Sequence, residues 1–220
     1  MRRVFIVRHG KTQWNLAKRL QGAGADSPLL TDDQEQYQAL AAYLDQYRFA
    51  AVYSSPLGRA QASAARVATA MTTPLPPCQT VAGLTELSFG QWEGQTQAAL
   101  VASAPALFQK LSARQPDPGL VALGVEDFTQ ARRRFTAALW TIARALGPDD
   151  NALVFSHGGI GQLGIQAATG NDALLGLKNL STSILGVVAD AFYLDVYNQT
   201  GYLPQVDLNE GNVSILARKD

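Results

Sequence analysis

The chain has 220 residues, of which 47% are hydrophobic and 16% are charged. These proportions exclude a disordered or fibrous protein, and the length suffices for one sizeable hydrophobic core. Lys plus Arg and Asp plus Glu each total 18. This balance indicates neither nucleic acid nor an anionic membrane as a partner, but it is compatible with a local basic pocket for a small anion.

The N-terminus and the cysteine content bear on the compartment. The chain begins MRR and has only four apolar residues before Arg8, which is too short for a signal sequence, and no apolar run approaches a membrane span. Cys78 is the only cysteine, so no intramolecular disulfide can form. It stands in a Pro-rich connector and is interpreted as a spare thiol. We expect a soluble cytoplasmic protein.

The first half of the chain alternates short apolar runs with helical patterns. Val4–Val7 is apolar and rich in β-branched residues, as in a strand covered on both faces. The sequence TDDQ from Thr31 to Gln34 has the form of a capping box and opens a predicted amphipathic helix over Asp32–Tyr47. A second strand is predicted at Phe49–Tyr53. Ser55-Pro56 then opens an Ala-rich helix that runs to about Met71.

The second half continues the alternation after the connector and the segment LTELSFGQWEG at 84–94. Residues Gln95–Leu146 are predicted to be mainly helical, with a break near Gln115–Gly119. A strand at Ala152–Phe155 is followed by SHGGIG and a helix. Late strands are predicted at Ile184–Val188, Ala191–Tyr197 and Val213–Ala217. This order predicts an α/β fold with helices on both faces of a sheet.

The chain contains two histidines, His9 and His157, and their local contexts are alike. Each follows a short apolar run and is followed at once by glycine. In an open α/β sheet, ligands bind beyond the carboxyl ends of the strands. If the two strands are neighbours, the imidazoles converge. Two histidines that merely cap strand ends are the less favoured interpretation of this duplicated pattern.

The residues around the histidines favour phosphoryl transfer. A neutral imidazole is a good nucleophile near pH 7 and can form a covalent intermediate. Arg8 precedes His9, and Arg59 falls in the first turn of a predicted helix. Two guanidiniums can grip a dianionic phosphoryl group by paired hydrogen bonds. A zinc site is disfavoured, because catalytic zinc usually has three protein ligands and the arginines would repel a cation.

A leaving alkoxide also needs a proton, so a phosphatase needs a general acid within reach. Glu86 and Glu93 both lie in the segment LTELSFGQWEG. A carboxyl partly buried near Phe89 or Trp92 could keep its proton near neutral pH. The residues alone do not separate the two candidates, and a surface loop glutamate is a serious competing interpretation for either.

Arg8 to Asn15, RHGKTQWN, resembles the RHGxTxxN signature of the histidine phosphatase superfamily, also called the phosphoglycerate mutase-like family. Further segments resemble the family's motifs in the same order. They are the phosphate-pocket loop at Gln21-Gly22 and 26–29 (DSPL), the strand-to-helix segment 54–60 (SSPLGRA), the acid loop 86–94, the second histidine motif 156–159 (SHGG) and the Asn-x-Ser turn at 179–183. Three features at the pocket rim depart from the family's pattern. The loop between Gly22 and Asp26 is one residue longer than usual, a second leucine (Leu30) precedes Thr31, and Gln34 stands where relatives often have glycine.

The resemblance implies roles for individual residues. His9 would be phosphorylated, and Glu86 rather than Glu93 would donate the proton and then activate water. Arg8, Arg59 and His157 would bind the phosphoryl oxygens. Further substrate contacts are implied for Thr12, Asn15, Gln21, Gly22 and Gly158. The implied fold is a three-layer α/β/α sandwich with a mostly parallel sheet, formed by a single domain over residues 1–220, with no metal and no other cofactor.

The family contains both phosphatases and mutases. Family mutases carry basic residues and a tyrosine after the acid-loop glutamate, whereas the run after Glu86 reads LSFGQWEGQTQAAL. This favours a phosphatase for a small phosphorylated substrate. A cofactor-dependent phosphoglycerate mutase is the alternative, and a non-catalytic phosphoester-binding module is less favoured. The helical section at about 95–146 is a candidate cover for the site, and a two-fold homodimer is the default assembly.

Overall fold

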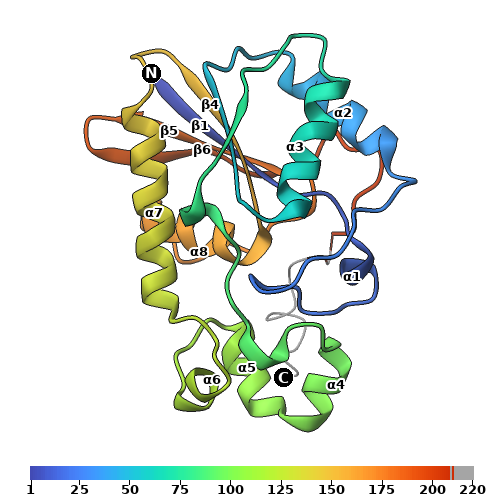
Figure 1. The fold of residues 1–220 in the computed structure, drawn as a ribbon. Coiled ribbons are helices and arrows are strands. Elements are labelled where there is room, and N and C mark those ends of the chain that lie inside the picture. The colour runs from blue at the N-terminus through green and yellow to red at the C-terminus, as the bar shows by residue number, and fades with distance from the viewer. Residues whose placement is uncertain (209, 211–220) are drawn as a thin grey trace.

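The computed structural model describes residues 1–208 and residue 210 (Figure 1). Its strands are β1 Arg2–Arg8, β2 Ala51–Ser54, β3 Cys78–Thr80, β4 Asn151–Ser156, β5 Thr182–Val188 and β6 Ala191–Gln199. Its α-helices are α1 Gln13–Leu16, α2 Gln34–Leu44, α3 Gly58–Ala70, α4 Gln97–Ser103, α5 Pro105–Ser112, α6 Pro118–Ala122, α7 Phe128–Arg144 and α8 Gly158–Thr169. Two short 3₁₀ helices, η1 Ala82–Leu84 and η2 Gly90–Trp92, lie in the loop after β3.

Within the described residues, six strands form one sheet in the order β3-β2-β4-β1-β5-β6. The first four strands in this order are mutually parallel, while β5 runs antiparallel to β1 and β6 antiparallel to β5. The mostly parallel α/β sheet expected from the sequence is thereby confirmed. The strand predicted at Val213–Ala217 lies outside the described residues.

Helices cover both faces of the sheet, because the central strands are apolar on both sides. Val4 and Ile6 of β1 belong to a core cluster with buried residues of α7 and α8. Phe5 and Val7, which point the other way, belong to a second cluster with α2 and α3. Figure 1 shows the same arrangement, with α7 and α8 on one side of the sheet and α2 and α3 on the other. The fold is the three-layer sandwich that the resemblance implied.

Helices α2 and α3 begin later than the sequence predicted. The Thr31–Gln34 capping box does not form: α2 starts at Gln34, and its N-cap residue, Asp33, makes no side-chain capping hydrogen bond. Arg66 Nη1 instead donates to the Leu30 carbonyl at 2.7 Å and to Asp33 Oδ1 at 3.0 Å. These bonds from the neighbouring helix hold the segment before α2 in a non-helical path.

Helix α3 likewise starts at Gly58, so Pro56 precedes the helix and does not occupy its first turn. The N-terminus is capped from outside the segment, because Asp26 Oδ2 accepts a hydrogen bond from the Arg59 amide at 3.2 Å. The Pro-rich connector also contains structure that the sequence did not predict. Cys78–Thr80 pair with β2 as an exposed edge strand.

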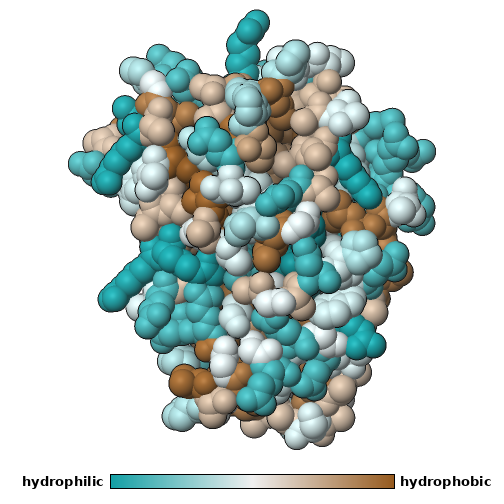
Figure 2. Space-filling view, viewed as in Figure 1, coloured by the Kyte–Doolittle hydropathy of each residue, from teal (hydrophilic) through white to brown (hydrophobic). Residues whose placement is uncertain are grey.

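The helical section after the acid loop forms helices α4, α5, α6 and α7, and α4 to α6 gather at one end of the sheet (Figure 1). Leu100, Phe108, Leu111 and Leu120 are buried and extend the α7 and α8 core cluster into this section. Figure 2 shows hydrophilic and hydrophobic residues interspersed over the visible face. None of the helices among the described residues has both the length and the apolar character that a membrane crossing needs.

Candidate active site

The two histidines lie side by side at one edge of the sheet. Strands β1 and β4 pair in parallel with Arg8 opposite Ser156, so His9 and His157 are the residues that follow the last matched pair. The His9 amide donates to the Ser156 carbonyl at 2.9 Å. The ring centroids are 5.2 Å apart and the ring planes meet at 60°. The juxtaposition that the duplicated sequence context suggested is therefore present.

Hydrogen bonds fix the orientation of both rings. His9 Nδ1 lies 2.7 Å from the Gly10 carbonyl oxygen, which can only accept, so Nδ1 carries the proton and Nε2 has a free lone pair. The His9 carbonyl accepts from Asn179 Nδ2 at 2.8 Å. His157 Nε2 lies 2.7 Å from Ser55 Oγ, and its buried Nδ1 has no partner among the described residues.

Two guanidiniums flank the histidines, and both are nearly inaccessible: Arg8 is 8% exposed and Arg59 is 2% exposed. Arg59 Nη1 donates to Asp26 Oδ1 at 3.0 Å, and its Nη2 donates to the Gly22 carbonyl at 2.8 Å. Arg8 Nη1 donates to the Leu177 carbonyl, and Arg8 Nη2 lies 3.4 Å from Glu210 Oε1. The Nε atoms of both arginines are buried without a partner in the described residues.

This setting keeps both imidazoles neutral. Burial lowers the pKa of His9 well below its ordinary value of 6.5, and the charges of Arg59 and Arg8 lower it further. Burial also lowers the pKa of His157, with Arg59 and His9 adding to the effect. A neutral His9 with Nδ1 protonated presents the Nε2 lone pair that nucleophilic attack requires.

Glu86 lies at the N-terminus of α8 and is 8% exposed. Its Oε1 accepts from the Ile160 amide at 2.7 Å and from the Leu87 amide at 2.9 Å, and its Oε2 accepts from the Gly159 amide at 3.0 Å. The sequence attributed its environment to Phe89 and Trp92. The immediate neighbours of the carboxyl oxygens are instead backbone amides, which hold them at a defined place beside the histidines.

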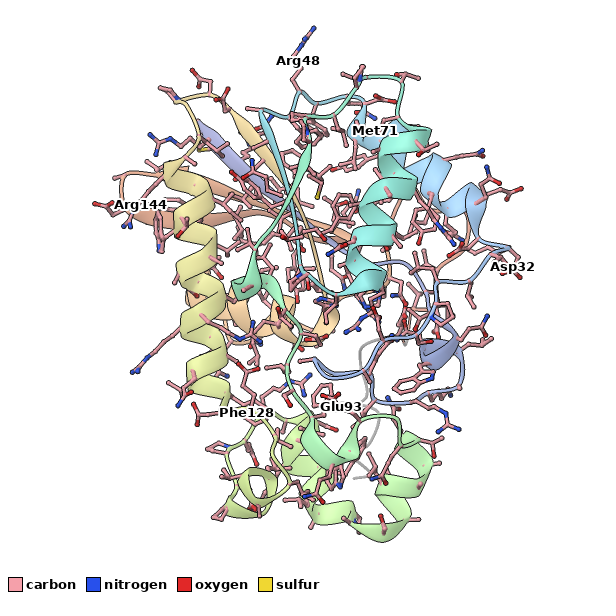
Figure 3. All side chains as sticks on the ribbon, in the orientation of Figure 1. Asp32, Arg48, Met71, Glu93, Phe128 and Arg144 are labelled. Atoms are coloured by element: carbon pink, nitrogen blue, oxygen red, sulfur yellow. The ribbon has the colours of Figure 1, made fainter. Side chains whose placement is uncertain are left out.

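Glu93, the rival acid, has a different position. Its Oε1 accepts from the amides of Ala23 at 3.1 Å and Phe89 at 3.0 Å, and its Oε2 accepts from Gly24 at 2.9 Å. Figure 3 places Glu93 between the sandwich and the helices below it. Gly22 has a φ of +45°, and a Cβ there would lie 2.0 Å from Glu93 Oε1. Glu93 therefore braces the loop that carries Gly22.

Three residues of the implied substrate pocket hold one another. Thr12 is the N-cap of α1: its Oγ1 accepts from the Asn15 amide at 3.1 Å, and its own amide donates to Asn15 Oδ1 at 3.1 Å. Thr12 Oγ1 also donates to Gln21 Oε1 at 2.8 Å. At the other side of the site, Gly158 allows close approach, because a Cβ there would lie 3.1 Å from Arg8 Nε.

These elements enclose a cavity of about 170 Å³. Eight residues singled out from the sequence line it: Arg8, His9, Asn15, Gln21, Gly22, Arg59, Glu86 and Gly158. The remaining two, Thr12 and His157, are fully buried behind this lining. Across the residues that the structure describes, no group of three or more His, Cys, Asp or Glu side chains is placed to hold a metal ion.

The structure also gives a place in the site to residues to which the sequence analysis assigned no individual role. Asp26 anchors Arg59, Ser55 contacts His157, and Glu210 faces Arg8. Arg19 and Arg114 line the cavity. No periodicity or motif in the sequence marks these two arginines, because each lies in an irregular segment whose path depends on packing against other parts of the chain.

The comparison with protein families accounts for this geometry. The model of the histidine phosphatase superfamily (branch 1) matches residues 4–200. The chain belongs to this superfamily. A probable phosphoglycerate mutase GpmB of Proteus mirabilis (strain HI4320) is 33% identical to this superfamily member over 160 residues, 72% of this chain and 70% of that protein. The match to GpmB of Escherichia coli (strain K12 / DH10B) is 39% identical but spans 70 residues, 32% of either protein.

Solved structures of both phosphatases and mutases are similar to this superfamily member. The mycobacterial glucosyl-3-phosphoglycerate phosphatase, solved with VO3, has a TM-score of 0.78 at 26% identity, with 91% of this chain and all (100%) of that chain covered. The α-ribazole phosphatase of Shigella flexneri has a TM-score of 0.72 at 26% identity, covering 90% and 96%. A phosphoglycerate mutase of Bacillus anthracis str. Sterne has a TM-score of 0.75 at 25% identity, covering 91% and 94%.

The lowered histidine pKa values predict how the free energy of unfolding depends on pH. Between the unfolded pKa near 6.5 and the lower folded pKa, the unfolded chain binds protons that the folded chain does not, so stability falls as pH falls. Both histidines should therefore make the folded protein less stable at pH 5.5 than at pH 7.5. Urea unfolding at these two pH values measures the loss.

The control is the double variant His9→Gln, His157→Gln, which contains no histidine and loses only the contribution of the carboxyl groups over the same pH range. An equal loss of stability in the wild type and the double variant would contradict the neutral, buried state of both rings.

Proposed function

We propose that this protein is a metal-independent phosphatase that hydrolyses small phosphate monoesters through a phosphohistidine on His9, with Glu86 as the proton donor. The observation that carries the proposal is the state of His9: its Nδ1 donates to the Gly10 carbonyl at 2.7 Å, so Nε2 has its lone pair free beside Arg8 and Arg59. Positive charge around a neutral nucleophile suits a phosphoryl dianion.

In the first step, His9 Nε2 attacks phosphorus, the P–N bond forms and the P–O bond to the alcohol breaks. Arg8 and Arg59 stabilise the negative charge on the phosphoryl oxygens. The protonated Glu86 carboxyl gives its proton to the departing oxygen. The Gly10 carbonyl stabilises the positive charge that develops on the imidazole through the Nδ1–H bond.

In the second step, water attacks phosphorus while the Glu86 carboxylate accepts a proton from it, and the P–N bond breaks to release phosphate and neutral His9. Glu86 thus returns to its protonated form. Its two oxygens rest on amides of Leu87, Gly159 and Ile160, which keeps the acid in one place through both steps.

Arg134 of α7 supports this placement as a positioning residue. Its Nη1 donates to the carbonyls of Gly83 at 2.9 Å and Thr85 at 2.7 Å, and its Nη2 donates to the Glu86 carbonyl at 3.1 Å. The guanidinium is itself fixed by Glu126, with Nε donating to Oε1 at 2.6 Å and Nη2 to Oε2 at 2.9 Å. One side chain therefore ties the backbone of the acid loop to α7.

A phosphoglycerate mutase is the second candidate, and one observation favours it. The sequence run after Glu86 has no basic residue, but Arg114 and Arg19 bring two guanidiniums into the lining of the same cavity. Basic groups near the acid are what a bisphosphate intermediate would need. The similarity to a probable phosphoglycerate mutase of Proteus mirabilis supports the same candidate, whereas similarity to the two solved phosphatases supports hydrolysis.

The two candidates separate when the protein is incubated with 3-phosphoglycerate, with and without 2,3-bisphosphoglycerate. We expect inorganic phosphate and glycerate as products in both cases, because nothing in the proposal requires a priming cofactor. Colorimetric phosphate measurement and NMR of the products check this. Formation of 2-phosphoglycerate without phosphate release would replace the phosphatase proposal with the mutase.

His9→Ala should abolish hydrolysis of p-nitrophenyl phosphate, because the covalent path requires the imidazole. EDTA should leave the wild-type rate unchanged. Rapid acid-free quenching after mixing with labelled substrate should trap an acid-labile, alkali-stable phosphoenzyme in the wild type alone. Lys11→Ala removes a side chain that does not line the cavity and is the matched control. A wild-type rate in the His9→Ala variant would show that His9 is not the nucleophile.

Glu86→Gln should lower kcat by roughly 10²–10⁴ for alkyl phosphates and much less for p-nitrophenyl phosphate, whose leaving group needs no proton. Arg134→Ala should show the same dependence on the leaving group with a smaller loss, and Arg134→Lys should recover part of it. Arg133→Ala on the same helix is exposed and serves as the control. Equal losses of kcat for alkyl phosphates and p-nitrophenyl phosphate would show that Glu86 is not the acid and that Arg134 does not position it.

A further inference from the structure

Glu93 is the carboxylate of the acid loop that the proposed chemistry leaves without a role. Its side chain is half-buried, and its two oxygens accept hydrogen bonds from three backbone amides. The amides of Ala23 and Phe89 donate to Oε1 at 3.1 Å and 3.0 Å, and the amide of Gly24 donates to Oε2 at 2.9 Å. Charge-assisted bonds of this kind are stronger than bonds between neutral groups. Glu93 is therefore a firm anchor between two loops.

The carboxylate meets loop 22–26, which reads GAGAD, at two glycines. A Cβ built on Gly22 would lie 2.0 Å from Glu93 Oε1, and one built on Gly24 would lie 2.9 Å from Glu93 Oε2. A side chain at either position would displace the carboxylate from the loop. The composition of the loop is thus matched to the close approach of Glu93.

The same loop holds the guanidinium of Arg59. Nη2 donates to the Gly22 carbonyl at 2.8 Å, and Nη1 donates to the Ala25 carbonyl at 3.1 Å and to Asp26 Oδ1 at 3.0 Å. All the hydrogen bonds that this guanidinium makes to the described residues go to loop 22–26. The path of the loop therefore determines where the Arg59 charge stands in the cavity.

Backbone hydrogen bonds fix Glu93 opposite the loop. The Leu20 carbonyl accepts from the Gly94 amide at 2.8 Å, and the Leu20 amide donates to the Gln95 carbonyl at 3.0 Å. The segment just before loop 22–26 and the segment just after Glu93 consequently run side by side. The carboxylate is held in register with the amides that it binds.

Resting on the proposed function, we propose that Glu93 is a positioning residue for phosphoryl binding, whose carboxylate holds loop 22–26 in the path that fixes the Arg59 guanidinium in the cavity. Two of the amides that it binds lie inside this loop, whose length departs from the family's pattern. The third belongs to Phe89 in the acid loop. Glu93 thereby links the loop that carries the proposed proton donor to the loop that holds the phosphoryl-binding arginine.

Glu93→Gln tests the carboxylate. The variant keeps the shape of the side chain but replaces one acceptor oxygen by an NH₂ group, which then faces an amide N–H. We expect kcat/KM to fall by about tenfold to a hundredfold. The loss should be the same for alkyl phosphates and p-nitrophenyl phosphate, because Arg59 holds the phosphoryl group that both share. A loss confined to alkyl phosphates would make Glu93 a proton donor and would overturn the inference.

A double variant tests whether the effect passes through Arg59. Arg59→Lys keeps the charge, but one nitrogen cannot span the Gly22 carbonyl and the Asp26 carboxylate as the two guanidinium nitrogens do. Adding Glu93→Gln to Arg59→Lys should therefore lower kcat/KM by no more than about twofold. An undiminished loss in this background would show that Glu93 acts on the fold and not through Arg59.

Asp45→Asn is the matched control. Asp45 also ties a loop through its carboxylate, because Oδ2 accepts from the Thr72 amide at 2.9 Å and Oδ1 accepts from the Thr73 amide at 2.9 Å. These residues follow the C-terminal end of α3, whereas Arg59 lies at its start; Figure 3 shows Met71 at the upper end of α3 and Glu93 below the lower end. The control should be less stable in urea yet keep the wild-type kcat/KM. Equal falls of kcat/KM in Asp45→Asn and Glu93→Gln would overturn the inference.

Gly24→Ala reaches the same contact without changing Glu93, because its Cβ would lie 2.9 Å from Oε2. This variant should lose part of kcat/KM, by the same factor for both kinds of ester. It keeps the inference testable where Glu93→Gln does not fold. In that event, a wild-type kcat/KM in Gly24→Ala would overturn the inference.

Binding of inorganic phosphate separates this inference from the proposed function. Calorimetry should find about tenfold weaker binding to Glu93→Gln than to the wild type or to Asp45→Asn. Such weakening in a protein whose wild type hydrolyses no ester would uphold this inference and overturn the proposed function. Hydrolysis with neither kcat/KM nor phosphate binding changed in Glu93→Gln would do the reverse.

Discussion

The parallel pairing of β1 with β4 is the constraint on which the site depends. The register sets Arg8 opposite Ser156, and one further backbone hydrogen bond, from the His9 amide to the Ser156 carbonyl, carries the alignment one residue beyond the sheet. Side chains alternate between the two faces of a strand, so a slip of one residue would turn one imidazole away from the other. The hydrophobic alternation of β1 between two cores fixes that register.

The two guanidiniums at this edge act both on His9 and on any anion that enters the cavity. The guanidiniums of Arg8 and Arg59 are buried, and each faces one carboxylate, Glu210 for Arg8 and Asp26 for Arg59. Burial is the main cause that lowers the pKa of His9, and the charges of Arg59 and Arg8 lower it further. The same charges favour an incoming anion. Under the proposed function, burial and the two guanidiniums together keep His9 neutral, and the guanidiniums attract the phosphoryl group.

Much of this arrangement was accessible from the sequence, for reasons that are local. Short apolar runs ending in RHG and SHG marked the strand ends. The family resemblance implied a role for Glu86, whose position at the start of α8 no local pattern reveals. The predicted starts of α2 and α3 were wrong because residues distant in sequence determine where these helices begin. Arg66 holds the segment before α2, and Asp26 caps α3. Arg114 escaped prediction because its position in the cavity depends on how α5 packs against the acid loop.

The segments that supply the site are widely spaced along the chain, and this has a consequence for how the protein matures. During synthesis, β1 emerges early, but its partner β4 lies beyond residue 150. Until that strand arrives, the apolar β1 has no parallel neighbour to shield it. Non-local pairing of this kind slows folding and prolongs the lifetime of aggregation-prone intermediates that expose hydrophobic surface. The site therefore cannot assemble, and β1 stays without its parallel neighbour, until the chain has been synthesised beyond β4 and the start of α8.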